Sequence, residues 1–241
     1  MSQKFTYLKE HRRTLDGEKI LPIIMDIIKP KSVVDVGCGS GTFLHYFKQQ
    51  NIEILGLDGS WCNREMLFEN IEPSDFLEID LENDFNLERR FDLAISLEVA
   101  EHISPERADN FVKNLTTLSD CILFSAAVPG QGGDHHVNEQ YVSYWIEKFG
   151  KHGYVFYDII RPKIWNETDV FGWYKQNSFL VTKKEFISSK YKFFYGYNVI
   201  HPDIFQAKVS ELNNILEGKR GISFYVNLLM KYFSYKFVRK K

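Results

Sequence analysis

Three glycines at alternate positions form the first pattern in this chain that suggests chemistry. Gly37, Gly39 and Gly41 directly follow the apolar run 32–36 and precede an amphipathic segment. Glycine lets the backbone turn sharply between a strand and a helix, so that a ligand can approach amide groups at the positive end of the helix dipole. The dinucleotide fingerprint GxGxxG requires a third glycine where this chain has Thr42, which disfavours a dinucleotide.

Two carboxylates follow the next two apolar runs. Asp58 ends the run that starts at Glu53 and lies 21 residues after Gly37, and Asp80 follows the run 75–79. A carboxylate at the position of Asp58 can accept hydrogen bonds from both hydroxyls of a ribose. Because the carboxyl ends of parallel strands meet at one edge of a sheet, we expect both side chains at a common ligand site.

Adjacent histidines occupy a glycine-rich polar segment, 130–139, after the fifth apolar run. Transfer of a group to a hydroxyl requires removal of the hydroxyl proton, and an imidazole can accept that proton at neutral pH, whereas an amine needs less help. The pair therefore favours an oxygen acceptor, with His135 or His136 as the base and Asp134 or Glu139 orienting it.

Metal binding is a second interpretation of the same segment, because Asp134, His135 and His136 are all ligand types. Consecutive side chains of an extended chain point to opposite faces, so three neighbours rarely reach one ion without a sharp turn. We do not favour a metal on this basis. A third interpretation is a helix N-terminus decorated with polar side chains.

Strand-like and helix-like segments alternate through the first 182 residues. The expected strands are 32–36, 53–57, 75–79, 91–96, 121–128, 154–160 and 178–182. The expected helices are 20–28, 42–50, 61–70, 104–118 and 138–152. This alternation predicts an α/β fold with a doubly wound, mostly parallel seven-stranded sheet.

Two further regions complete the predicted organisation. Residues 161–176 contain Trp165, Trp173 and Tyr174 without a clean period, and we expect a lid-like aromatic insertion that forms a wall for a flat acceptor or a sugar. We expect one domain over residues 1–182 and a helical C-terminal extension over residues 183–241.

The ordered segments DVGCGSG, LGLD, EIDL and FDLAISLEVAEHI resemble those of class I S-adenosylmethionine-dependent methyltransferases, of a type 11 or 12-like kind, over about residues 30 to 130. The resemblance implies a Rossmann-like methyltransferase fold. It implies that the loop containing Gly37, Gly39 and Gly41 passes along the amino-acid part of the cofactor. It further implies ligand contacts for acidic and apolar side chains: Asp35 to the ammonium group, Asp58 to the ribose, and Asp80 with Leu81 to the adenine edge.

The same resemblance concerns the segment after the fourth strand. Glu98 lies where that family faces the methionine moiety, and Glu101 with His102 matches a frequent EH pair. For His102 we favour a role in orienting the loop over a catalytic role. Cys38 is expected to be a small spacer beside the cofactor, since no base adjoins it in the sequence.

Composition limits the classes of function. Hydrophobic residues make up 44% and charged residues 26% of the 241 residues, which is typical of a globular protein and excludes wholesale disorder. A formal net charge of −2 gives no general attraction to phosphate backbones, so nucleic acid is not the expected partner. Three widely spaced cysteines, without a secretory signal, suggest the cytoplasm.

The segment 231–241 has five basic and no acidic residues, beside a polar stripe of Asn227, Lys231 and Ser234 in an otherwise apolar helix pattern. Contact with an acidic membrane surface is one explanation. Docking on the domain or in a homodimer interface is the other, and is favoured here.

The sequence thus predicts a methyltransferase that moves a methyl group from S-adenosylmethionine, leaving S-adenosylhomocysteine, to a hydroxyl of a small polar acceptor. A sugar or nucleotide-linked sugar in surface-glycan synthesis is the expected acceptor. Methylation of nitrogen or a carboxylate of a metabolite is the alternative within the enzymes. A cofactor-binding partner of another transferase, without catalysis, is the alternative outside them.

Overall fold

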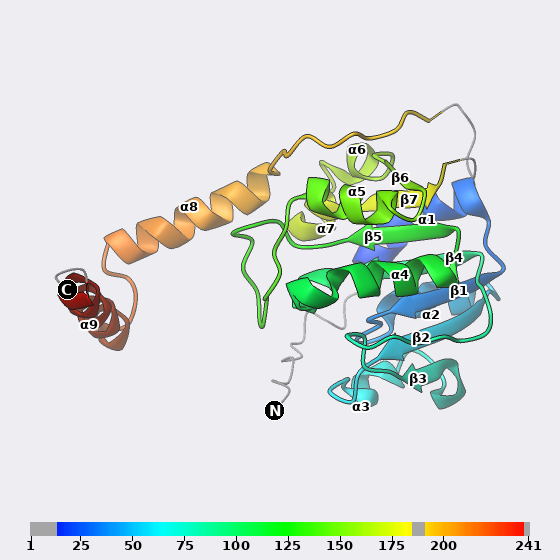
Figure 1. The fold of residues 1–241 in the computed structure, drawn as a ribbon, viewed down its shortest axis with the longest axis horizontal. Helices are drawn as coiled ribbons and strands as arrows, with labels where there is room; N and C mark the ends of the chain where they lie inside the picture. Colours follow the sequence, from blue (N-terminus) through cyan, green and yellow to red (C-terminus); the bar gives the residue numbers. More distant parts are fainter. Residues whose placement is uncertain (1–13, 185–190, 239–241) are drawn as a thin grey trace. The chain divides into compact units, whose positions relative to one another are not determined.

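The computed structural model describes residues 14–184 and 191–238, and the chain divides into two compact units, residues 1–199 and residues 200–241. The first unit contains a seven-stranded sheet with helices on both faces (Figure 1). The prediction of a Rossmann-like, doubly wound fold is confirmed.

The sheet is mostly parallel, with the strand order β3-β2-β1-β4-β5-β7-β6. The strands are β1 (Ser32–Val36), β2 (Glu53–Asp58), β3 (Phe76–Glu78), β4 (Leu93–Leu97), β5 (Cys121–Ser125), β6 (Tyr154–Tyr157) and β7 (Phe179–Lys183). Only β7 breaks the parallel arrangement within this sheet, since it runs antiparallel to both β5 and β6. The strand order reverses direction between β1 and β4, and open α/β sheets bind ligands beyond the carboxyl ends of the strands at such a switch point.

Helices cover both faces of the sheet. The longer helices of the first unit are α1 (Leu15–Ile28), α2 (Thr42–Gln49), α4 (Ala108–Leu118) and α5 (Val142–Gly150), and the shorter ones are α3 (Arg64–Leu67), α6 (Arg161–Ile164) and α7 (Gly172–Asn177). Side chains of α4 and α5 share one apolar core, whereas those of α1, α2 and α6 share a second. Successive strand residues point to opposite faces, so Val33 packs into the second core and Val34 into the first.

Several elements differ from the sequence-based expectation. The expected helix 61–70 is only the four-residue α3, where the side chain of Asn63 caps the helix by accepting from the Met66 amide at 3.1 Å. The expected helix 138–152 begins at Val142, because residue 141 is extended and the preceding segment is a loop. Residues 161–176 are not an irregular insertion, since they contain α6 and most of α7.

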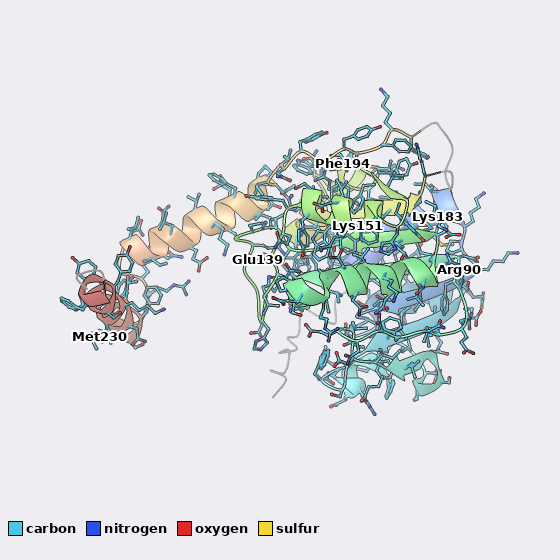
Figure 2. All side chains as sticks on the ribbon, viewed as in Figure 1. Arg90, Glu139, Lys151, Lys183, Phe194 and Met230 are labelled. Atoms are coloured by element: carbon cyan, nitrogen blue, oxygen red, sulfur yellow. The ribbon has the colours of Figure 1, made fainter. Side chains whose placement is uncertain are left out.

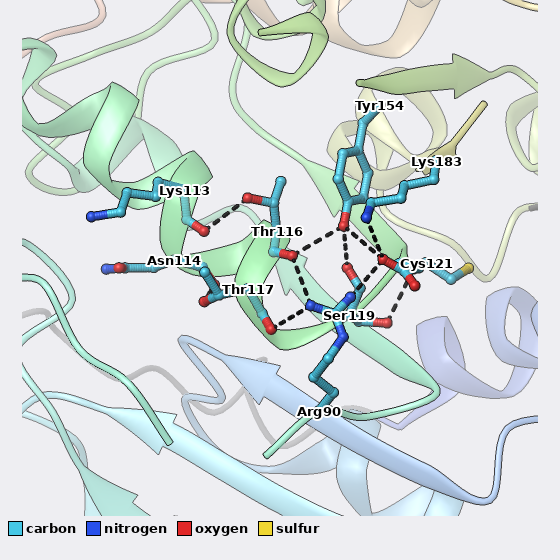
Figure 3. Close-up of polar contacts among 10 residues, drawn as sticks. Arg90, Lys113, Asn114, Thr116, Thr117, Ser119, Cys121, Tyr154 and Lys183 are labelled. Carbon is cyan, nitrogen blue, oxygen red and sulfur yellow. Dashed lines mark hydrogen bonds and ion pairs between the residues drawn. The ribbon is translucent and has the colours of Figure 1, made fainter. Parts of the chain in front are cut away.

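A polar network holds the turn between α4 and β5 (Figure 3). The Arg90 guanidinium donates to the Thr117 carbonyl at 2.8 Å, and the Tyr154 hydroxyl donates to the Ser119 carbonyl at 2.6 Å. The last carbonyls of a helix lack intrahelical donors, so Arg90 caps α4. Burial raises the pKa of Tyr154 to about 12, and the hydroxyl keeps its proton for this bond. The network fixes the amino end of β5, at the sheet edge opposite the one where ligands are expected.

The second unit is helical, as predicted, with α8 (Pro202–Leu216) and α9 (Ile222–Val238). His201 caps α8 by accepting from the Asp203 amide, and the Tyr225 hydroxyl of α9 donates to the Ile215 carbonyl at the end of α8, at 2.8 Å. Among the residues that the structure describes, none of the helices has the length and apolar composition required to cross a bilayer.

The turn after β1 depends on a glycine. Gly37 has a φ of +86°, and its amide donates to the Leu57 carbonyl at 2.7 Å. A Cβ added at Gly37 would lie 2.4 Å from Cγ2 of Val99, which follows β4. The turn therefore fits between the ends of three neighbouring strands only because position 37 has no side chain.

We expect Gly37→Ala to lower the free energy of unfolding by about 2 to 4 kcal/mol, because it combines a left-handed φ with a steric clash. Gly153→Ala is the matched control. Gly153 has a φ of +78°, and no atom of the part of the chain that the structure describes lies within 4 Å of an added Cβ, so only the conformational cost of about 1 kcal/mol remains. Chemical denaturation measures both, and equal losses would contradict the close packing at Gly37.

Candidate functional site

Asp35 and Asp58 lie buried at the carboxyl ends of β1 and β2, where the sequence places the cofactor. The Asp58 carboxylate accepts hydrogen bonds from the amides of Gly39 at 2.8 Å and Gly59 at 2.7 Å. It thereby ties the glycine loop to the end of β2. A carboxylate has about four acceptor positions, so Asp58 retains capacity for a ribose hydroxyl.

Burial also changes the protonation of these acids. It raises the pKa of Asp35 to about 8, with repulsion from Asp58 as the second cause. Burial likewise raises the pKa of Asp58, although the amides of Gly39 and Gly59 act in the opposite direction. Two buried acids side by side favour a cationic ligand, because a positive charge would stabilise both ionised forms. This donor set fits a cofactor with an ammonium group and a ribose.

Asp80 and Leu81, expected at the adenine edge, follow β3. The Asp80 carboxylate is exposed and accepts from the Glu82 amide at 3.1 Å and the Asn83 side chain at 3.1 Å, which orders the turn. Leu81 is buried in the core that contains α4 and α5. Their contacts with an adenine remain predictions.

Glu98 follows β4 and is held from two directions. Its carboxylate accepts from the Gln131 side chain at 2.7 Å and the Asn177 side chain at 3.1 Å. Burial raises the pKa of Glu98, and these donors partly offset it. Asn177, at the end of α7, also donates to Gln131 at 2.9 Å. The last residue of α7, directly after the segment 161–176 that was predicted as a lid, is therefore bonded to the residue expected beside the methionine moiety.

The loop between β5 and α5 orients His136. The Glu139 carboxylate, in the loop seen in Figure 2, lies 2.8 Å from Nδ1 of His136. Glu139 also accepts from the amides of Gly130 at 2.7 Å and Gly132 at 2.6 Å. Burial opposes ionisation of Glu139, but these hydrogen bonds hold its pKa below the ordinary value. An ionised carboxylate thus fixes the ring, with Nε2 directed away from it.

The two histidines of the predicted pair have different surroundings. His135 has a φ of +59°, and its Nε2 lies 3.7 Å from Oδ1 of Asp134, with both side chains partly or fully exposed. His136 is more enclosed, with 12% of its side chain exposed. A Cβ added at Gly133 would come within 2.3 Å of Nε2 of His136, so glycine is needed where the loop passes this atom. Sequence reasoning missed that role of Gly133.

A third group of side chains surrounds Nε2 of His136. One ligand atom each from Glu101, His102 and His136 lies within 4.8 Å of the others. The Nε2 of His136 is 3.9 Å from Oε1 of Glu101, and the two imidazole rings meet edge to face at 4.9 Å between centroids. Asp134 and His135 are not part of this group, so the metal-ligand combination considered from the sequence is replaced by another.

Glu101 is fully buried, and within residues 14–184 and 191–238 neither of its carboxylate oxygens has a hydrogen-bond partner of ordinary geometry. Burial, followed by repulsion from Glu98, raises its pKa well above the usual range. Burial lowers the pKa of His102 to about 4, with His136 as the second cause, so His102 is a neutral imidazole at pH 7. A carboxyl group and two imidazoles form a ligand set that divalent transition metals accept.

One feature of the sequence could have indicated the group of Glu101, His102 and His136, namely that its members follow two neighbouring strands of the predicted parallel sheet. Glu101 and His102 lie in a 3₁₀ turn, Ala100–His102, directly after β4, and His136 lies in the loop after β5. Because β4 and β5 are parallel neighbours, their following segments meet at the same sheet edge. Backbone bonds join them as well, since the Glu101 carbonyl accepts from the amides of Val137 and Asn138, both at 2.9 Å.

If Asp35 holds the ammonium group of S-adenosylmethionine, the ionised form must bind it. Because the pKa of Asp35 is about 8, affinity should rise by up to about tenfold per pH unit as the pH approaches 8 from below. We expect this dependence to disappear in Asp35→Asn and to persist in Asp80→Asn, measured by titration calorimetry. The same slope in Asp35→Asn would contradict the assignment.

Part of the chain is similar to a known protein family. Residues 8–122 match the family model of a methyltransferase domain. No curated protein is similar to the chain in sequence.

Solved structures with a similar fold are methyltransferases. The methyltransferase domain of bacterial CtHen1-C is 18% identical, with 70% of this chain and 98% of that one covered, at a TM-score of 0.52. The small RNA methyltransferase HEN1 is 16% identical, with 83% of this chain and 29% of that one covered, at a TM-score of 0.50. At identities this low, the structural similarity shows a shared fold and nothing more. The family match places a methyltransferase domain over residues 8–122, and the solved structures show that its fold is shared with methyltransferases.

Proposed function

We propose that this enzyme methylates a hydroxyl group of a small polar acceptor, with His136 as the general base. The observation that carries the proposal is the hydrogen bond of 2.8 Å between Glu139 and Nδ1 of His136. A base whose second nitrogen is fixed by an ionised carboxylate has a defined tautomer, with Nε2 able to accept a proton. An amine acceptor would depend less on a general base and on a carboxylate that orients it.

The bound cofactor supplies a methyl group on a positively charged sulfur, which an in-line nucleophile can take up. Asp35 and Asp58 bind the cofactor, and His136 accepts the hydroxyl proton at Nε2 as the oxygen forms its bond to the methyl carbon. S-Adenosylmethionine held by these residues would supply the methyl group from its sulfur, and S-adenosylhomocysteine would be the product released. The ionised Glu139 stabilises the imidazolium that forms, and general base catalysis of this kind contributes about 10²- to 10⁴-fold.

A sugar or a nucleotide-linked sugar in surface-glycan synthesis is our proposed acceptor. Support comes from the aromatic segment around α7. Phe171 and Trp173 stack with 4.3 Å between ring centroids, and burial raises the pKa of Tyr174 well above its usual value, with the charge of Glu98 as the next cause. Tyr174 therefore lies within electrostatic reach of the expected methionine site. Aromatic rings beside a polar site favour the apolar face of a sugar ring.

A divalent metal bound by Glu101, His102 and His136 is a second way to activate the hydroxyl. The observation in its favour is the buried Glu101 carboxyl group, which has no hydrogen-bond partner of ordinary geometry among the described residues. A cation there would provide a positive partner for the Glu101 carboxylate. It would also lower the pKa of an acceptor hydroxyl bound to the cation. Both mechanisms transfer the methyl group to oxygen, but in the second His136 is a ligand and not the base.

Replacement of His136 by alanine should lower turnover by at least about 100-fold, because the proton acceptor is lost. Affinity for S-adenosylmethionine should be unchanged. His135→Ala is the matched control, and we expect a much smaller loss because His135 lies outside the group around Glu101. Mass spectrometry of nucleotide-linked sugars incubated with methyl-labelled donor measures turnover. Normal turnover in both variants would contradict a histidine base.

Metal participation is tested by Mn²⁺ binding, followed by electron paramagnetic resonance. If the metal mechanism holds, the enzyme binds Mn²⁺, Glu101→Gln weakens binding by at least about tenfold, and chelation abolishes turnover. Asp134→Asn, which removes the carboxylate suggested by the sequence, should leave Mn²⁺ binding unchanged. Full turnover after chelation, without Mn²⁺ binding, would exclude the metal and leave the His136 base.

A further inference from the structure

The helix α9 exposes apolar side chains on most of its surface. Between Ile222 and Tyr235 only Tyr225 is partly buried, and every other residue is exposed. The large exposed apolar residues are Ile222, Phe224, Val226, Leu228, Leu229, Met230, Tyr232, Phe233 and Tyr235. Figure 2 labels Met230 on this helix, where 65% of its surface is exposed. Soluble proteins rarely leave so large an apolar surface without a partner.

The polar residues of α9 define a narrow stripe. Ser223, Asn227, Lys231 and Ser234 follow one another at intervals of four, four and three residues, which places them on one side of the helix. All other sides carry apolar side chains from Ile222 to Tyr235. A helix of this pattern is stable only when nearly its whole circumference is buried, with the stripe facing water.

The charged residues of α9 and of the segment after it are all basic. Lys219 and Arg220, which precede α9, form ion pairs with Glu217 and Glu211. From Gly221 to the last residue the sequence has five basic and no acidic residues: Lys231, Lys236, Arg239, Lys240 and Lys241. A surface that covers α9 must therefore offer an apolar region and also carry negative charge. A second copy of α9 supplies the apolar surface, but its own five basic residues repel those of the first copy.

We propose that α9 lies in the head-group region of a bilayer that contains anionic lipids, parallel to the surface, with its polar stripe toward water. Negative head groups match the basic residues, and the acyl chains cover the apolar sides. Lys231 lies within the stripe and reaches the head groups directly. Tyr232 and Tyr235 bring apolar rings with polar hydroxyls, which suit the boundary between lipid and water.

The binding test uses the full chain and sucrose-loaded vesicles in a sedimentation assay. Vesicles of phosphatidylcholine are compared with vesicles of phosphatidylcholine and phosphatidylglycerol. We expect at least about tenfold stronger binding to the anionic vesicles, and weaker binding when salt rises from about 0.1 M to about 0.5 M. Equal binding to both vesicles, or no binding to either, would overturn the proposal.

Two adjacent substitutions separate apolar burial from charge. Phe233→Asp puts a negative charge on an apolar side of α9, and Ser234→Asp puts the same charge on the polar stripe. We expect Phe233→Asp to weaken vesicle binding by at least about tenfold and Ser234→Asp by less than about threefold. Equal losses would show that charge alone acts, which contradicts insertion of α9.

Folding and alternative partners are controlled separately. Both variants should bind S-adenosylmethionine like the original chain, because α9 belongs to the second compact unit. Analytical ultracentrifugation without lipid follows the oligomeric state. A stable dimer that dissociates in Phe233→Asp, together with no vesicle binding, would assign α9 to a contact between copies. Protection of α9 from proteolysis in a monomer that binds no vesicles would assign it to docking on the chain's own domain. Either result overturns the proposal.

Discussion

The burial of two acidic side chains at one sheet edge is the constraint on which the rest of this structure depends. Asp35 and Asp58 lie at the ends of neighbouring parallel strands, where the register pairs Val36 with Leu57. Removing carboxylates from water is costly, and the cost is greater when two face each other. In the protein without a ligand, this cost is seen as the raised pKa of Asp35. A ligand with an ammonium group and a ribose offsets it, so the binding of S-adenosylmethionine follows from the fold as well as from the motif.

The same edge gathers the groups proposed to act on the acceptor. The segments after β4 and β5 meet there because these strands are parallel neighbours, and this brings Glu101 and His102 to His136. The loop after β5 is anchored at both ends of its glycine-rich part, through Glu139 and through the carbonyl of Glu101. A loop held this way can keep an imidazole in one orientation, which positioning for an in-line transfer requires.

Much of the first unit could be predicted from the sequence, because its strands are short apolar runs closed by turn signals. The bounds of β1 were predicted to the residue, and the predicted carboxylates Asp35 and Asp58 lie at the expected strand ends. Helix bounds were harder, since the side chain of Asn63 and the extended Tyr141 set helix starts through local geometry.

The group of Glu101, His102 and His136 could not be predicted from residue spacing alone. His136 is 34 residues from His102 in the sequence, and their contact depends on the strand order and on the path of the loop past Gly133. Sequence reasoning could identify each residue as a candidate. It left Asp134 and Glu139 both open as partners of the histidine, and it grouped His136 with Asp134 and His135 as possible metal ligands. Glu139 contacts His136, whereas Asp134 contacts His135, and these contacts are determined by the conformation of the folded loop.

In the proposed mechanism, the methyl donor and the His136 group face one another across a single reaction site. A crystal structure of the protein with S-adenosylhomocysteine would show whether they do. We expect the adenosine beside Asp58, the amino group beside Asp35, and the sulfur turned toward the space bounded by His136 and Glu98. Density for the sulfur on the far side of the glycine loop from His136, or no binding of this product at the ends of β1 and β2, would contradict it.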